Sequence, residues 1–228
     1  APGAQGPGRQ DQRDGMKTDD WIAMLATGAQ PVPAHALERH LGTALVAGVA
    51  GAGVLMLLVF GLRPELAQMA ALPMFWGKLG FAAALALPAG WALLRLARPG
   101  ADWRRVLRWA ALPVALVWAL AGWALLQSPE ADRWGQVLGS TWRSCPFNIA
   151  LLSVPMWIAC FGVLRRAAPT RLAWAGAGAG LLAGAVGALV YAVHCPEMAL
   201  PFVAVWYVAG MMIPTALGAL LGPRLLRW

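Results

Sequence analysis

Six apolar stretches, each long enough to cross a lipid bilayer, constrain this chain more than any other feature. A transmembrane helix needs about 20 mostly apolar residues. The six stretches run approximately over residues 41–62, 74–94, 109–127, 146–164, 172–193 and 200–222. None shows the polar–apolar alternation of a strand, and lipid does not tolerate an open sheet edge. The sequence therefore predicts an all-α integral membrane protein built as a bundle of six transmembrane helices.

The overall composition excludes a water-soluble domain. Of the 228 residues, 60% are apolar or aromatic and only 12% are charged, whereas soluble domains carry about 25% charged residues. Because so few charges cannot cover a soluble surface, we expect membrane lipid to surround the chain. Direct contact with nucleic acid is not expected, although the net charge is +8.

The basic residues predict how the chain is oriented. Lysine and arginine near the ends of transmembrane helices stay on the cytoplasmic side. Fourteen of the 18 basic residues lie before the first stretch, in the connections 95–108 and 165–171, or in the C-terminal tail. We therefore expect both termini in the cytoplasm. The 128–145 and 194–199 loops then lie on the outer side, which in a bacterium is the periplasm.

The N-terminal region divides into two parts before the transmembrane domain. Residues 1–15 are rich in Gly, Pro and Gln and have no apolar run. We interpret them as a disordered tag or upstream extension, with Met16 as the natural start. Residues 16–40 are then a cytoplasmic segment, and residues 41–228 form the six-helix transmembrane domain.

A short amphipathic helix is predicted within residues 16–30. Thr18 can cap its start, and two acidic residues follow in the first turn, where the helix dipole favours negative charge. Three apolar residues then recur at the i, i+3, i+4 spacing of one helix face. A helix of about two turns is not stable alone in water, so it must dock on the membrane, on the loops of its own chain or on a partner protein. Its acidic first turn and single apolar face favour a groove of a partner over an anionic membrane surface. The residues expected at that contact are Asp19, Asp20, Trp21, Met24 and Leu25.

Two Cys-Pro steps lie in the short loops on the outer side. Cys145 precedes Pro146 at the start of the fourth stretch, and Cys195 precedes Pro196 between the fifth and sixth stretches. Proline favours the first position of a helix, and a helix N-terminus makes a thiol more acidic. We expect Cys145 and Cys195 to lie close together in space. The third cysteine, Cys160, falls inside the fourth stretch and is expected to act as a small buried apolar residue.

The residues leave three interpretations of the Cys145–Cys195 pair open. The thiols can form and break a disulfide in response to oxidants. Alternatively, they can bind a soft divalent metal ion such as Zn, Cd or Cu, with His194 and Glu197 as further ligands. The third interpretation is a permanent structural disulfide, which an oxidising compartment permits. No obligate cofactor is expected.

The sequence favours a regulator over an enzyme or a transporter. It contains no nucleophile elbow, no HExxH motif and no Walker loop. A membrane thiol–disulfide oxidoreductase is the main alternative, but such an enzyme needs a CxxC motif or two cysteine pairs, and this chain has three cysteines. A small-solute transporter is less favoured because no acidic residue lies inside a stretch.

Two features within the stretches have structural explanations. Gly176, Gly180 and Gly184 lie on one helix face and predict close helix–helix packing. Lys78 lies near the outer end of the second stretch, and we expect its side chain to extend to the lipid headgroups.

Five segments of the chain resemble the NrsF-type membrane anti-sigma factors of proteobacteria. They read KTDDWIAMLATGA, PMFWGK, STWRSCPFNI, VHCPE and PFVAVWYVAGM, and the resemblance covers residues 16–228. It implies a multi-pass protein of the bacterial inner membrane that holds an extracytoplasmic-function sigma factor inactive. It also implies release under stress by heavy metals or reactive oxidants, sensed through two outer cysteines that correspond to Cys145 and Cys195.

Overall fold

The computed structural model describes residues 18–27, 35–98, 103–167 and 169–227. The chain divides into two compact units, residues 1–36 and 37–228. Helix α1 (Thr18–Thr27) belongs to the first unit. Residues 1–15, interpreted above as an extension, lie outside the described residues.

The second unit contains the six predicted membrane-crossing helices. Each is long and apolar enough to cross a membrane, which confirms the all-α, six-helix prediction. The sixth helix consists of three consecutive segments, of which the middle one, η1, is a short π-helical turn. In chain order the helices are α2 (Ala36–Val59), α4 (Pro73–Leu96), α5 (Trp103–Gln127), α7 (Cys145–Arg166), α8 (Leu172–His194), and α9 (Leu200–Phe202) with η1 (Val203–Tyr207) and α10 (Val208–Leu225).

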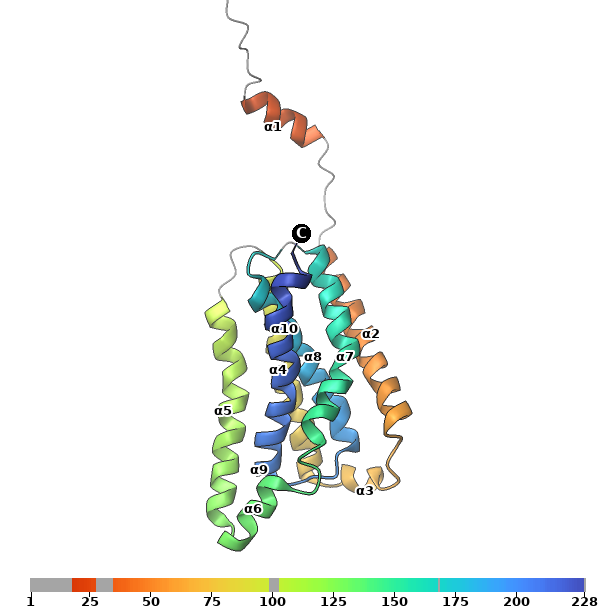
Figure 1. The fold of residues 1–228 in the computed structure, drawn as a ribbon, viewed down its shortest axis with the longest axis vertical. Coiled ribbons are helices and arrows are strands. Elements are labelled where there is room, and N and C mark those ends of the chain that lie inside the picture. Colours follow the sequence, from red (N-terminus) through yellow and green to blue (C-terminus); the bar gives the residue numbers. More distant parts are fainter. Residues whose placement is uncertain (1–17, 28–34, 99–102, 168, 228) are drawn as a thin grey trace, which may run out of the picture. The chain divides into compact units, whose positions relative to one another are not determined.

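Helix α8 occupies the centre of the bundle and packs against α4, α7 and α10 (Figure 1). Its small residues allow this. A Cβ atom on Gly176 would collide with the carbonyl oxygen of Gly218, and one on Gly180 would collide with that of Pro214. The expectation of close packing along this glycine face is confirmed. Helices α2 and α5 lie at opposite sides of the bundle and expose large apolar side chains, as lipid-facing helices do.

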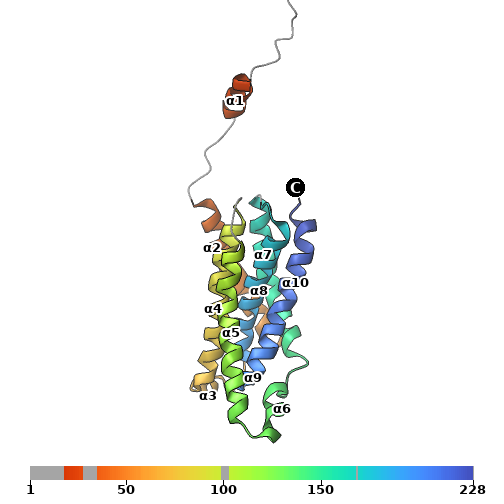
Figure 2. The ribbon, with the colours of Figure 1, turned by 90° about the vertical axis from the view of Figure 1, so that its left-hand side faces the viewer.

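Two short helices between the spans were not predicted. Helix α3 (Leu66–Ala70) follows α2, and α6 (Glu130–Leu138) lies within the loop expected over residues 128–145. The acidic residues Glu130 and Asp132 lie in the first turn of α6, where their negative charges interact favourably with the helix dipole and stabilise the helix. Both short helices lie at the end of the bundle where residues 195–199 connect α8 to α9 (Figures 1 and 2). We call this the thiol end.

Candidate functional site

Cys145 and Cys195 are brought together at the thiol end. Cys145 is the first residue of α7, and Cys195 follows the last residue of α8. Both side chains are 0% exposed, both are free thiols, and they belong to the same cluster of buried side chains, where each thiol affects the pKa of the other. Two thiols in this arrangement can form a disulfide by losing two protons and two electrons to an oxidant.

Cys195 is the thiol of the pair whose pKa is lowered by its surroundings. Hydrogen bonding to Cys145 lowers the pKa of Cys195, although burial acts in the opposite direction. The Lys78 ammonium lowers the pKa of Cys195 further by its charge. Because the thiolate is the reactive form of cysteine, this environment favours reaction at Cys195.

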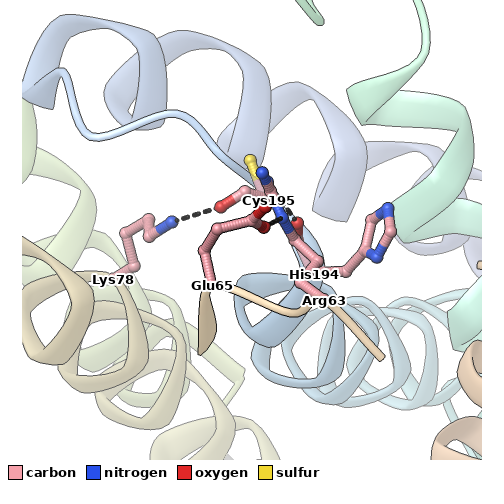
Figure 3. Close-up of polar contacts among 5 residues, drawn as sticks. All are labelled: Arg63, Glu65, Lys78, His194 and Cys195. Atoms are coloured by element: carbon pink, nitrogen blue, oxygen red, sulfur yellow. Dashed lines mark hydrogen bonds and ion pairs between the residues drawn. The ribbon is translucent and has the colours of Figure 1, made fainter. Parts of the chain in front are cut away.

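Lys78 does not extend to the lipid headgroups, so that expectation was wrong. Its side chain is 0% exposed, and its Nζ donates hydrogen bonds to the carbonyl oxygens of Cys195 and Glu197, each 2.9 Å away. Figure 3 shows the ammonium reaching the Cys195 carbonyl from α4. The non-helical turn after α8 presents carbonyl groups inside the bundle, and these take the place of headgroups as hydrogen-bond acceptors.

A second cation, Arg63, holds the neighbouring residue of the same turn. Its Nη1 donates to the carbonyl oxygen of His194 at 3.1 Å, and its Nε lies 3.6 Å from Oε2 of Glu65 (Figure 3). In the sequence, Arg63 is notable only as one of the four basic residues expected on the outer side. Its contact depends on the segment between α2 and α3 passing close to the end of α8, which no local pattern indicates.

Glu197 ties the two cysteine loops together. Its Oε1 accepts hydrogen bonds from the backbone N–H and hydroxyl of Ser140, at 2.8 and 2.6 Å. It also accepts them from the N–H and hydroxyl of Thr141, at 3.1 and 3.2 Å. Burial raises the pKa of this carboxyl, but the hydrogen bonds outweigh burial and lower it. Gly139 permits the approach, because it has φ of 56° and a Cβ there would lie 2.6 Å from Glu197 Oε2.

The proposed ligand set of Cys145, Cys195, His194 and Glu197 is not assembled. The His194 imidazole packs against the ring of Phe60, with centroids 5.1 Å apart, and the Glu197 carboxylate is engaged as described above. Within the described ranges, no three His, Cys, Asp or Glu side chains are placed to hold a metal ion together. In this structure the two thiols are therefore the only members of that set that face each other.

Cys160 lies apart from the thiol pair. It is fully buried in α7 and belongs to a different cluster of core side chains, with Met156 and Leu164 among its neighbours. Its position agrees with the expected role as a small buried apolar residue.

Helix α1 carries exposed apolar side chains in its own unit. The helix spans Thr18–Thr27, and none of its residues is buried. The sequence pattern predicts three of its large apolar residues but not Ile22, which is 59% exposed. Ile22 directly follows Trp21, so it falls outside the i, i+3, i+4 pattern counted from Trp21. It widens the apolar face of the helix. The large apolar residues that α1 exposes are Trp21, Ile22, Met24 and Leu25.

Comparison with known proteins gives a consistent picture. The family model described as "NrsF: Negative regulator of sigma F" matches residues 25–228. The probable anti-sigma-F factor NrsF of Azospira oryzae is 46% identical over 213 residues, which cover 93% of this chain and 100% of that protein. The anti-sigma-F factor NrsF of Caulobacter vibrioides is 38% identical over 222 residues, with coverage of 93% and 100%. No solved structure matches the chain.

Proposed function

The chain belongs to the NrsF family of negative regulators of sigma F, and on that premise we propose that it is a membrane anti-sigma factor controlled by its thiol pair. It holds an extracytoplasmic-function sigma factor inactive through its N-terminal segment. It releases the sigma factor when Cys145 and Cys195 react with an oxidant or a heavy metal. The observation that carries this proposal is the pair of free, fully buried thiols that lie in one cluster between two loops.

The N-terminal segment is the proposed sigma-binding element. Its helix α1 exposes an apolar face next to the acidic residues Asp19 and Asp20 of its first turn. Exposed Trp and Leu side chains at helical spacing are typical of a helix that lies in a groove of a partner. A groove with an apolar floor and basic residues at one end fits this face.

The thiol end is the proposed sensing part of the protein, which we place in a bacterial inner membrane. The distribution of arginines favours a cytoplasmic location for the opposite end of the bundle. The thiol end then faces the periplasm, where oxidants and metal ions arrive first. Because two loops meet at the thiols, a new bond there changes how the start of α7 and the end of α8 sit together.

The geometry supports disulfide formation more directly than metal binding. Two facing thiols are sufficient for a disulfide, whereas tetrahedral zinc requires four ligands. A metal ion bound by Cys145 and Cys195 needs further ligands from a rearranged loop, from a small molecule or from a two-coordinate soft ion. We therefore propose oxidation as the primary signal and soft-metal binding as a second signal at the same sulfurs.

Co-purification of the sigma factor with the full chain tests this function. We expect the wild type to retain the sigma factor from unstressed cells and to lose it after treatment with an oxidant or cadmium. The Cys145→Ser, Cys195→Ser double variant should retain it in both conditions or in neither. A double variant that releases the sigma factor as the wild type does would refute thiol sensing. A wild type that never retains it would refute the anti-sigma role.

A further inference from the structure

Lys78 is the buried charged side chain of the bundle, and its position is costly. Among the residues whose burial is described, no other charged side chain is buried. Removing an ammonium from water is unfavourable unless its donors are used. Lys78 lies close to the end of its helix, where a lysine can extend to the headgroups instead. Its side chain turns into the bundle, which points to a role there.

The two carbonyl groups that Lys78 holds lie on either side of Pro196. They belong to Cys195 and Glu197, in a turn that is not part of any helix. Proline has no N–H group to donate, so this turn has few backbone hydrogen bonds of its own. Two hydrogen bonds that converge on one ammonium fix the direction of the peptide groups between them. The direction of the Cys195 side chain depends on those peptide groups.

We propose that Lys78 is the positioning residue of the thiol pair. By holding the carbonyl groups on both sides of Pro196, it keeps Cys195 facing Cys145. The inference deepens the proposed function and rests on it, because it concerns the same two sulfurs.

Arg63 provides the matched comparison for Lys78. It is also a cation that donates to a carbonyl group at the thiol end, that of His194. That residue is the last of α8, and the helix itself already fixes its backbone, with Cys195 N–H bonded to the Tyr191 carbonyl at 2.9 Å. Loss of Arg63 therefore removes a cation without freeing the turn that carries Pro196.

The rate of disulfide formation in the purified chain tests the inference without a sigma factor. The reduced full chain, in lipid nanodiscs, is treated with diamide, a small neutral oxidant. An S–S bond forms between Cys145 and Cys195, and their two protons and two electrons pass to the N=N bond of diamide, which becomes a hydrazine. Mass spectrometry of the linked peptides gives the rate.

Three variants give distinct expectations, and a fourth replaces the first if the first does not fold. Lys78→Met has no donor, and it should form the disulfide at least about tenfold more slowly, because small misplacements of reacting groups cost that much or more. Lys78→Gln keeps two N–H donors but lacks the charge that lowers the pKa of Cys195, so it should react more slowly than the wild type and clearly faster than Lys78→Met. Arg63→Gln should react like the wild type. If Lys78→Met does not yield a folded, monodisperse protein, Lys78→Ser removes the same contact and leaves room for water.

Each result bears on the inference. A variant without the Lys78 donors that reacts as fast as the wild type, or faster, would show that the turn holds itself and would overturn the assignment. A Lys78→Gln variant as slow as Lys78→Met would assign the effect to charge and would also overturn it. If Lys78→Met is slow while the double cysteine variant still releases the sigma factor normally, the proposed function fails and the positioning role stands. If the double variant is unresponsive and Lys78→Met reacts normally, only the positioning role fails.

Discussion

The thiol pair and the apolar face of helix α1 differ in how far their side chains are buried. At the thiol end, Cys145 and Cys195 are fully buried beneath two loops, and Glu197 joins those loops through four hydrogen bonds. In α1, no residue is buried, and Leu25 is 69% exposed. The thiols are buried by side chains of their own chain, whereas the large apolar side chains of α1 are exposed among the residues that the structure describes.

This difference fits the two roles proposed for the thiol pair and for α1. A sealed pair of thiols changes state when a small reagent reaches it, so it suits sensing. An uncovered apolar helix face gains free energy when a partner buries it, so it suits holding another protein. Variants of α1 should therefore change affinity for the sigma factor, and variants of the thiol end should change stability or response.

The largest effect is expected from charges placed on the α1 face. The Trp21→Asp, Leu25→Asp variant should lower the affinity for the sigma factor by at least about 100-fold, because truncating such anchors commonly costs 2 kcal/mol or more each, roughly. Affinity is measured by titration of the purified full chain with the sigma factor. Ala23→Asp, on the opposite side of the helix, is the control and should bind nearly as the wild type does. Equal losses in both variants would place the contact elsewhere.

A smaller effect is expected when the tie between the loops is removed. Glu197→Ala should lower the free energy of unfolding by about 1–3 kcal/mol, because the hydrogen-bond donors of Ser140 and Thr141 lose a charged acceptor. The measurement is thermal or denaturant unfolding in detergent. Glu130→Ala is the control, since that exposed side chain makes a weak 3.8 Å ion pair with Arg133 and is not one of the groups that join the two loops. An equal effect in the control would mean that Glu197 does not tie the loops.

The same carboxylate predicts a pH dependence confined to the thiol end. The folded pKa of Glu197 is lowered, so its stabilisation is fully present above the unfolded value of about 4.3. It is lost as the pH falls from there through the lower folded pKa. Amide hydrogen exchange in the 139–145 and 195–199 loops should rise over that window. Glu197→Gln should show no such step, and a step that persists in this variant would assign it to another group.

The smallest effect is expected at the remaining cysteine. Cys160→Ser should leave sigma retention and release unchanged, because Cys160 lies in a separate core cluster. Its cost should be limited to about 1 kcal/mol or a little more in unfolding free energy, for a hydroxyl placed in an apolar core. The release assay in stressed cells checks this. An unresponsive Cys160→Ser variant would contradict the division between sensing and structural cysteines.

Sequence alone determined the features that depend on local composition. The six spans could be predicted because crossing a bilayer requires a long apolar run, whatever the neighbouring helices are. The apolar face of α1 followed from its helical spacing, except for Ile22, which lies outside the simplest pattern. The common location of Cys145 and Cys195 followed from topology, because α7 begins and α8 ends at the same end of the bundle.

Only the tertiary structure decided which polar groups meet around the thiols. Lys78 and the Cys195 carbonyl, Arg63 and the His194 carbonyl, and Glu197 and the Ser140 loop are all far apart in the chain. A lysine near a helix end can extend into lipid headgroups or turn into the bundle, and local sequence does not distinguish the two. The choice depends on whether a neighbouring turn offers free carbonyl groups, and it does so here because Pro196 interrupts the helical hydrogen bonding between α8 and α9.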